Sequence, residues 1–138
     1  MADVIYTSFK RDIMNGAIDL DTDTIKVMLV TSTYTVSASH TKRSDITNEV
    51  SGTGYTAGGA TIGSPTVTNV STNGVFDGSD VAWTTSTITA RGAVLYKSRG
   101  GASSADELIC YLDFATDKVS TAGTFTISWN ASGILNLA

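Results

Sequence analysis

The side chains that could carry out a reaction are few and widely separated in this sequence. His40 is the only histidine and Cys110 the only cysteine. A serine or cysteine nucleophile needs a neighbouring base, and the sequence has no Gly-X-Ser-X-Gly turn of the kind that presents a hydrolase serine. Cys110 lies in an apolar run, where a thiol usually acts as a small hydrophobic group. We therefore expect no catalytic residue and no enzymatic activity.

Three aspartates have the spacing with which a calcium-binding loop begins. Asp19, Asp21 and Asp23 alternate along the chain, and oxygen ligands at alternate positions can surround Ca²⁺. The rest of the calcium pattern is missing, because Thr24 replaces the glycine of the sharp turn and Val30 replaces the bidentate glutamate. These three residues remain a weak calcium candidate, and we expect them mainly to form a turn that keeps a strand edge soluble. We expect no bound cofactor.

A glycine-rich segment at residues 52–57 matches the loosest form of the dinucleotide-binding pattern. Phosphate binding by this pattern needs a helix directly after the glycines. Gly58 and Gly59 follow instead and would break such a helix. The segment therefore predicts a loop.

The charge distribution argues against nucleic acid and membranes as partners. The formal net charge is −4, and only 16% of the residues are charged. The basic residues occur as isolated pairs, such as Lys10–Arg11 and Lys42–Arg43, whereas nucleic-acid binding needs clustered positive charge. The sequence shows neither a secretory signal nor an apolar stretch of about 18 residues. We expect a protein made in a cytoplasm, with no nucleic acid and no membrane as partner.

The N-terminal part predicts a short helix. Ile5, Phe9 and Ile13 recur at a spacing of four residues, which places them on one helix face. Asn15 and Gly16 are typical residues for the end of a helix. We expect one short helix here, before the first strand.

The rest of the chain predicts strands. Ile25–Val30 is a short, branched apolar run, and residues 31–61 read as a long surface loop. Turns are expected at residues 73–74 and 77–78, and a loop at residues 117–123. We expect Ile88, Ala90, Gly92, Val94 and Tyr96 to share one face of a strand. Other strands are expected near residues 67–70, 81–83, 108–114, 125–129 and 134–137. The prediction is one all-β domain over residues 1–138, an antiparallel, jelly-roll-like sandwich with one short N-terminal helix.

Several segments, in order along the chain, resemble those of one family of virion proteins. They are residues 6–16, 21–30, 49–59, 81–83 with 88–96, and 125–135. On these segments the chain is similar to the capsid decoration, or cement, proteins of short-tailed bacteriophages and their relatives. The resemblance implies a jelly-roll-like protein on the virion, at the outer surface of the phage head. It implies a clamp on neighbouring copies of the major capsid protein, a small homo-oligomer (dimer or trimer), and no catalytic residues.

The residues that would contact a partner are sought among apolar and aromatic side chains near the N-terminus and in the long loop, because such residues favour interfaces. The predicted contacts are Val4, Ile5, Tyr6, Phe9, Tyr34 and Tyr55. An alternative for Ile5 and Phe9 is that they belong to the core. An alternative function is a receptor- or glycan-binding module of a tail or fibre, in which Trp83 and Trp129 would stack on sugar rings.

Overall fold

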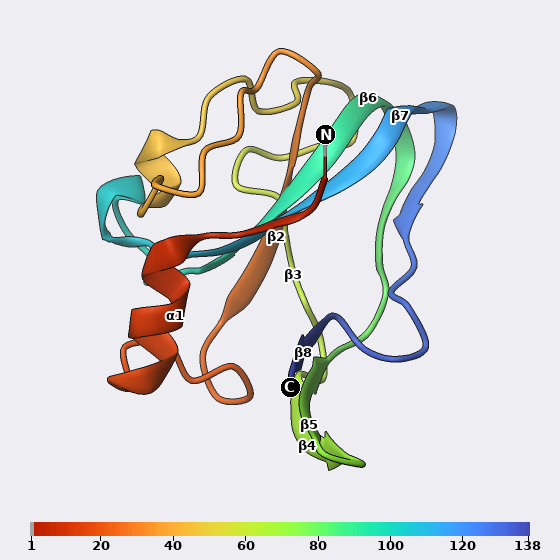
Figure 1. Cartoon of the computed structure of the whole chain (residues 1–138). Coiled ribbons are helices and arrows are strands. Elements are labelled where there is room, and N and C mark those ends of the chain that lie inside the picture. Colours follow the sequence, from red (N-terminus) through yellow and green to blue (C-terminus); the bar gives the residue numbers. More distant parts are fainter. Residues whose placement is uncertain (1) are drawn as a thin grey trace.

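A computed structural model describes residues 2–138 of the chain and shows two antiparallel sheets and one α-helix (Figure 1). The larger sheet has the order β1-β7-β6-β2-β3, and the smaller has the order β4-β5-β8. The bounds are β1 Val4–Ile5, α1 Thr7–Met14, β2 Ile25–Val30, β3 Ala60–Thr61, β4 Thr66–Val70, β5 Asn73–Asp77, β6 Val81–Lys97, β7 Leu108–Ile127 and β8 Leu135–Leu137, with 3₁₀ turns at Arg43–Asp45 and Ser103–Ala105. The predicted all-β fold with one short N-terminal helix is confirmed, and the jelly-roll arrangement stays a prediction.

Helix α1 is shorter than the stripe of apolar residues suggested. Phe9 is buried on its inner face, and the helix ends at Asn15, before Gly16 with its positive φ of 79°. Ile5 is not helical, because β1 pairs Val4 with Tyr111 and Ile5 with Cys110 of β7. Strand pairing at this position therefore overrides the helical spacing.

Strands β6 and β7 are longer than predicted and form the body of the larger sheet. Residues 117–123, expected as a loop, belong to β7 and pair with the first half of β6. A register shift between Ala90 and Gly92 changes which side chains face the core. Ile88 and Ala90 pack in the main core, whereas Val94 and Tyr96 lie in a second cluster. The predicted common face from Ile88 to Tyr96 is therefore wrong.

The β4–β5 hairpin is also offset from its prediction. Asn73 and Gly74, expected to form the turn, are the first residues of β5, and the connection is Ser71–Thr72. Ser71 takes the positive φ of 55° that a tight turn between antiparallel strands requires. Sequence preference for Asn-Gly thus misplaced the turn by two residues.

The larger sheet is covered on both faces where β2 pairs with the second half of β6, whereas the first half of β6 and its partner residues in β7 keep one face exposed. The main core lies on one face and includes buried residues of both sheets, such as Leu29 and Phe76. The second cluster lies on the other face and contains Tyr6, Met28, Val30, Tyr34, Val94, Tyr96, Leu108 and Tyr111. The long segment after β2 supplies Tyr34 and packs Val36 and Ile46 against this cluster. Among the residues described, no helix has the length and apolar character needed to cross a bilayer.

Candidate docking surface

Three of the aromatic residues predicted to meet a partner are core residues, and one of them, Phe9, packs in the main core. Tyr6 and Tyr34 are 0% and 4% exposed, and their hydroxyl groups share a hydrogen bond of 3.0 Å. Burial, together with the Tyr34 hydroxyl, holds the pKa of Tyr6 well above its usual value. Their rings pack in the second cluster, so neither ring is available to an approaching protein in this conformation.

His40 is positioned by a phenol. Its Nδ1 shares a hydrogen bond of 2.9 Å with the Tyr34 hydroxyl, an orienting contact that the sequence did not indicate. Cys110 is buried in β7, and burial raises the pKa of its thiol to about 12. A thiol with that pKa stays protonated at neutral pH and is a poor nucleophile. The geometry of these two residues fits a packing role.

Tyr55 is half-buried in a network of its own. Its hydroxyl donates to the Glu49 carboxylate at 2.6 Å and accepts from the Leu29 amide at 3.0 Å. Its ring lies 5.8 Å from that of Trp83. Burial raises the pKa of Tyr55 above its usual value, and the Glu49 carboxylate raises it further. Tyr55 therefore holds the glycine-rich loop on the sheet.

The two tryptophans differ in exposure. Trp83 is buried in the main core and packs edge-on against Phe125. Trp129 is half-exposed, and its indole N–H donates to the Ser79 carbonyl at 2.8 Å. A sugar ring could reach Trp129 but not Trp83, so the two do not form a joint stacking platform.

The three alternating aspartates do not converge on one point. The Asp23 carboxylate accepts from the Asp19 amide at 2.8 Å and pairs with Lys97 Nζ at 2.9 Å. Interaction between the carboxyl groups of Asp19 and Asp21 lowers the pKa of Asp19 and raises that of Asp21. Across residues 2–138, no group of three or more His, Cys, Asp or Glu side chains is placed to hold a metal ion. The aspartates shape the turn before β2.

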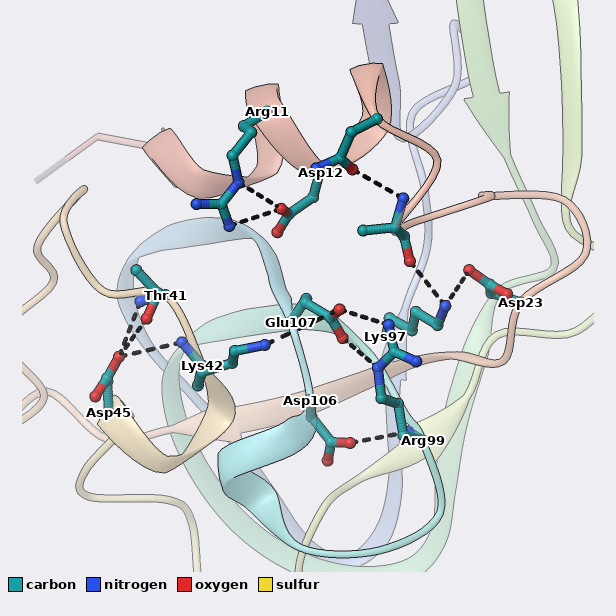
Figure 2. A network of polar contacts seen from close by, with 12 residues as sticks. Arg11, Asp12, Asp23, Thr41, Lys42, Asp45, Lys97, Arg99, Asp106 and Glu107 are labelled. Atoms are coloured by element: carbon teal, nitrogen blue, oxygen red, sulfur yellow. Dashed lines mark hydrogen bonds and ion pairs between the residues drawn. The ribbon is translucent and has the colours of Figure 1, made fainter.

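A network of ion pairs joins loops at one end of the larger sheet (Figure 2). Arg99 donates two hydrogen bonds to the Glu107 carboxylate, at 2.8 and 2.6 Å, and Lys42 lies 4.0 Å from it. The Asp106 carboxylate accepts from Arg43 Nε and from the Arg99 amide, both at 2.8 Å. Both carboxylates are buried. We call this set of five residues the ion clamp.

The ion clamp binds chain segments that are distant in sequence. The Arg43 guanidinium also lies over the ring of Tyr96, 5.1 Å from its centroid. Nearby, Lys97 joins β6 to the turn after α1, because its Nζ donates to the Ala17 carbonyl and pairs with Asp23 (Figure 2). The hydrogen bonds from Arg99 keep the pKa of Glu107 below its usual value. Arginine side chains already pair with the carboxylates of Asp106 and Glu107. We therefore interpret the ion clamp as a stabilising element.

An open groove lies between α1 and the smaller sheet. Its volume is about 500 Å³. Its apolar lining consists of Ile5, Phe9, Ile13, Ile18, Leu20, Val67, Val75, Phe76, Leu135 and Leu137. We call this the apolar groove. It contains Ile5 and Phe9, two of the residues predicted to contact a partner, whereas Val4 lines a smaller hollow beside it.

Large apolar side chains of the groove are open to solvent. Ile5 is 41%, Val67 48% and Leu137 67% exposed. Exposed apolar surface of this kind, gathered around a hollow, is typical of a binding site for another molecule. The sequence did not indicate the groove, because its residues come from both ends and the middle of the chain and the β4 residues alternate like those of an ordinary half-buried strand. We take the apolar groove as the candidate docking surface.

Comparisons of this chain with protein families, with curated proteins and with solved structures found no match.

Proposed function

We propose that this protein is a structural component of a tailed-phage virion. In this proposal it binds the outer surface of the head and stabilises neighbouring copies of the major capsid protein. The observation that supports it best is the apolar groove, in which solvent-exposed Val67 and Leu137 line a hollow on a rigid β scaffold. The segments that resemble decoration proteins lie between residues 6 and 135 and so extend over nearly the whole chain.

The distribution of stabilising contacts fits such a role. The second half of β6, with β2 and the start of β7, is buried on both faces, and the ion clamp lies at its end. A protein that binds only the assembled shell stabilises that shell by mass action. Modest contacts repeated over a symmetric surface gain strength by avidity. In this proposal each chain contributes one groove of about 500 Å³, and firm binding comes from the repetition of this contact over the shell.

The charge of the protein fits an outer surface. The formal net charge is −4, which would be repelled by packaged DNA. The groove lining is apolar apart from Asp19, Asp21 and Asn136. Contact with the shell would then depend on apolar burial and would be only weakly sensitive to salt.

The test is binding of purified protein to heads that lack it, measured by co-sedimentation and by the temperature at which the heads release DNA. Wild-type protein should bind and raise that temperature. Leu137→Asp should weaken binding strongly, because it places a charge in the groove. Val119→Asp is the matched control, since Val119 is 63% exposed but lies on β7 outside the groove, and it should bind like wild type.

Two outcomes would contradict the proposal. One is the absence of wild-type binding to heads together with unchanged thermal release. The other is localisation of the protein at the tail or fibres, accompanied by glycan binding, which would favour the receptor-binding alternative.

A further inference from the structure

Strand β4 is an edge that nothing in the described chain covers. All five of its residues, Thr66–Val70, are exposed. In the order β4-β5-β8, residues 2–138 place a strand on only one side of β4. Figure 1 shows the hairpin of β4 and β5 projecting away from the body of the molecule. The edge is therefore sterically open to another strand.

The composition of this edge lacks the usual protection against pairing. Soluble proteins protect exposed edges with charges, bulges or proline within the strand. β4 contains two valines, two threonines and an asparagine, and its pairing with β5 runs in register without a bulge. Pro65 precedes the strand rather than interrupting it. Such a neutral, regular edge is suited to pairing with another strand.

The hairpin determines which backbone groups face the open side. A two-residue connection makes its flanking residues, here Val70 and Asn73, exchange hydrogen bonds with each other. Successive residues of a strand then alternate, so Thr68 also directs its N–H and C=O toward β5. Val67 and Asn69 direct theirs toward the open edge. Two residues of β4 thus offer a donor and an acceptor each.

We propose that β4 pairs with β4 of a second copy of this chain, antiparallel and about a two-fold axis at Thr68. In this register Val67 of one copy lies opposite Asn69 of the other, so the outward backbone groups meet in two hydrogen-bonded pairs. Thr68 faces Thr68, and cross-strand threonine pairs are favourable. A two-fold axis makes the interface self-complementary, as in most homodimers. The result is a continuous six-stranded sheet.

Charge is the reason to choose a second copy as the occupant. Each chain carries a net charge of −4, so most ways of bringing two copies together are unfavourable. The three strands of the smaller sheet contain one charged residue, Asp77. Asp77 is paired with Thr66, which the proposed register places opposite Val70 of the other copy. The two Asp77 carboxylates would therefore lie at opposite ends of the joined sheet.

The proposed pairing leaves the apolar groove accessible. Val67 lines the groove, and Thr68, the next residue, projects from the opposite face of the strand. The edge would be used by the second copy and the groove face by another partner. This inference goes beyond the proposed function and stands or falls separately from it.

The first experiment measures self-association by sedimentation velocity over a range of concentrations, with two lysine variants. Wild type should sediment as two chains at high concentration. Thr68→Lys should shift the distribution to one chain, because it places two lysines directly opposite each other. Thr66→Lys is the matched control, since it adds the same charge to the same strand opposite Val70, and it should remain a dimer. Thermal unfolding of all three proteins checks that the hairpin is intact.

The second experiment uses mild oxidation of cysteine variants, with Cys110 buried and left in place. Thr68→Cys should form a disulfide-linked dimer rapidly. Thr66→Cys should not, because residue 66 lies opposite Val70 of the other copy, so the two introduced cysteines are four residues apart along the paired strands. A wild type that is monomeric throughout, equal behaviour of the two lysine variants, or equal crosslinking at positions 66 and 68 would overturn the proposal. Binding of a monomeric wild type to heads would leave the proposed function intact.

Discussion

The two sheets of this protein differ in how far their side chains are buried or paired with other side chains. In the larger sheet, Leu95 is fully buried and the carboxylates of Asp106 and Glu107 are held by arginines. In the smaller sheet, β4 is exposed along its whole length and Leu137 is 67% exposed. The buried part of the larger sheet is closed to a partner, whereas the smaller sheet leaves apolar surface and a strand edge open. We therefore expect stability and recognition to depend on different parts of this small chain.

The largest effect that this comparison predicts comes from truncating the same residue type in each sheet. Leu95→Ala should lower the free energy of unfolding by about 3 kcal/mol, because it leaves a cavity in the main core. Leu137→Ala should change it by less than about 0.5 kcal/mol, since exposed positions contribute little. Denaturant unfolding of both variants measures the difference. Equal losses would remove the distinction between the sheets.

The ion clamp should show the next largest effect. Asp106→Ala leaves Arg43 and the Arg99 amide without their acceptor and should cost about 2–3 kcal/mol, since breaking a buried pair is strongly destabilising. Asp117→Ala removes an exposed pair with Arg91 and should cost less than about 1 kcal/mol. Thermal or denaturant unfolding can compare them. Near-wild-type stability of Asp106→Ala would show that the clamp is dispensable.

The tyrosine pair beneath the long loop should have a smaller effect. Tyr34→Phe keeps the ring but removes the hydroxyl that bonds to both Tyr6 and His40. The buried Tyr6 hydroxyl then lacks this partner, and the cost should be about 1–2 kcal/mol. His40→Ala removes only the outer member and should cost less. Denaturant unfolding would contradict this order if His40→Ala were the more damaging change.

The smallest effect concerns pH. Because Arg99 keeps the pKa of Glu107 below its usual value of 4.5, ionised Glu107 stabilises the fold at neutral pH. That stability is lost as the pH falls below about 4.5 and through the lowered pKa of the folded state. Glu107→Gln should therefore be less stable than wild type at pH 7 and should lose less stability on acidification. Unfolding midpoints measured between pH 7 and pH 3 would refute this if the two curves stayed parallel.

Patterns local in sequence were predicted well. The run from Ile25 to Val30 is β2, with the predicted bounds, because a short branched apolar run has few alternatives to a buried strand. The end of α1 at Asn15 also matches the prediction. In both cases the determining residues lie within one element, so the sequence of that element is sufficient.

Features that depend on distant contacts were missed. The absence of a side chain at Gly92, next to a register shift, allows Tyr111 of the neighbouring strand to approach closely, since a Cβ on Gly92 would lie 2.5 Å from its ring. Nothing in the sequence around residue 92 reports that contact. The apolar groove is a stronger example, because Phe9 and Leu137 come from opposite ends of the chain. Of the predicted contacts, Tyr6, Phe9 and Tyr34 are core residues, because aromatic type alone does not distinguish an interface from a buried cluster.

The most direct test of the account is electron microscopy of phage heads to which the protein has been added. We expect density on the outer surface that follows the symmetry of the shell. The smaller sheet and the apolar groove should face the capsid protein, and the ion clamp should point to solvent. Density at the tail, or contact with the capsid through the ion clamp while the groove stays open, would contradict the account.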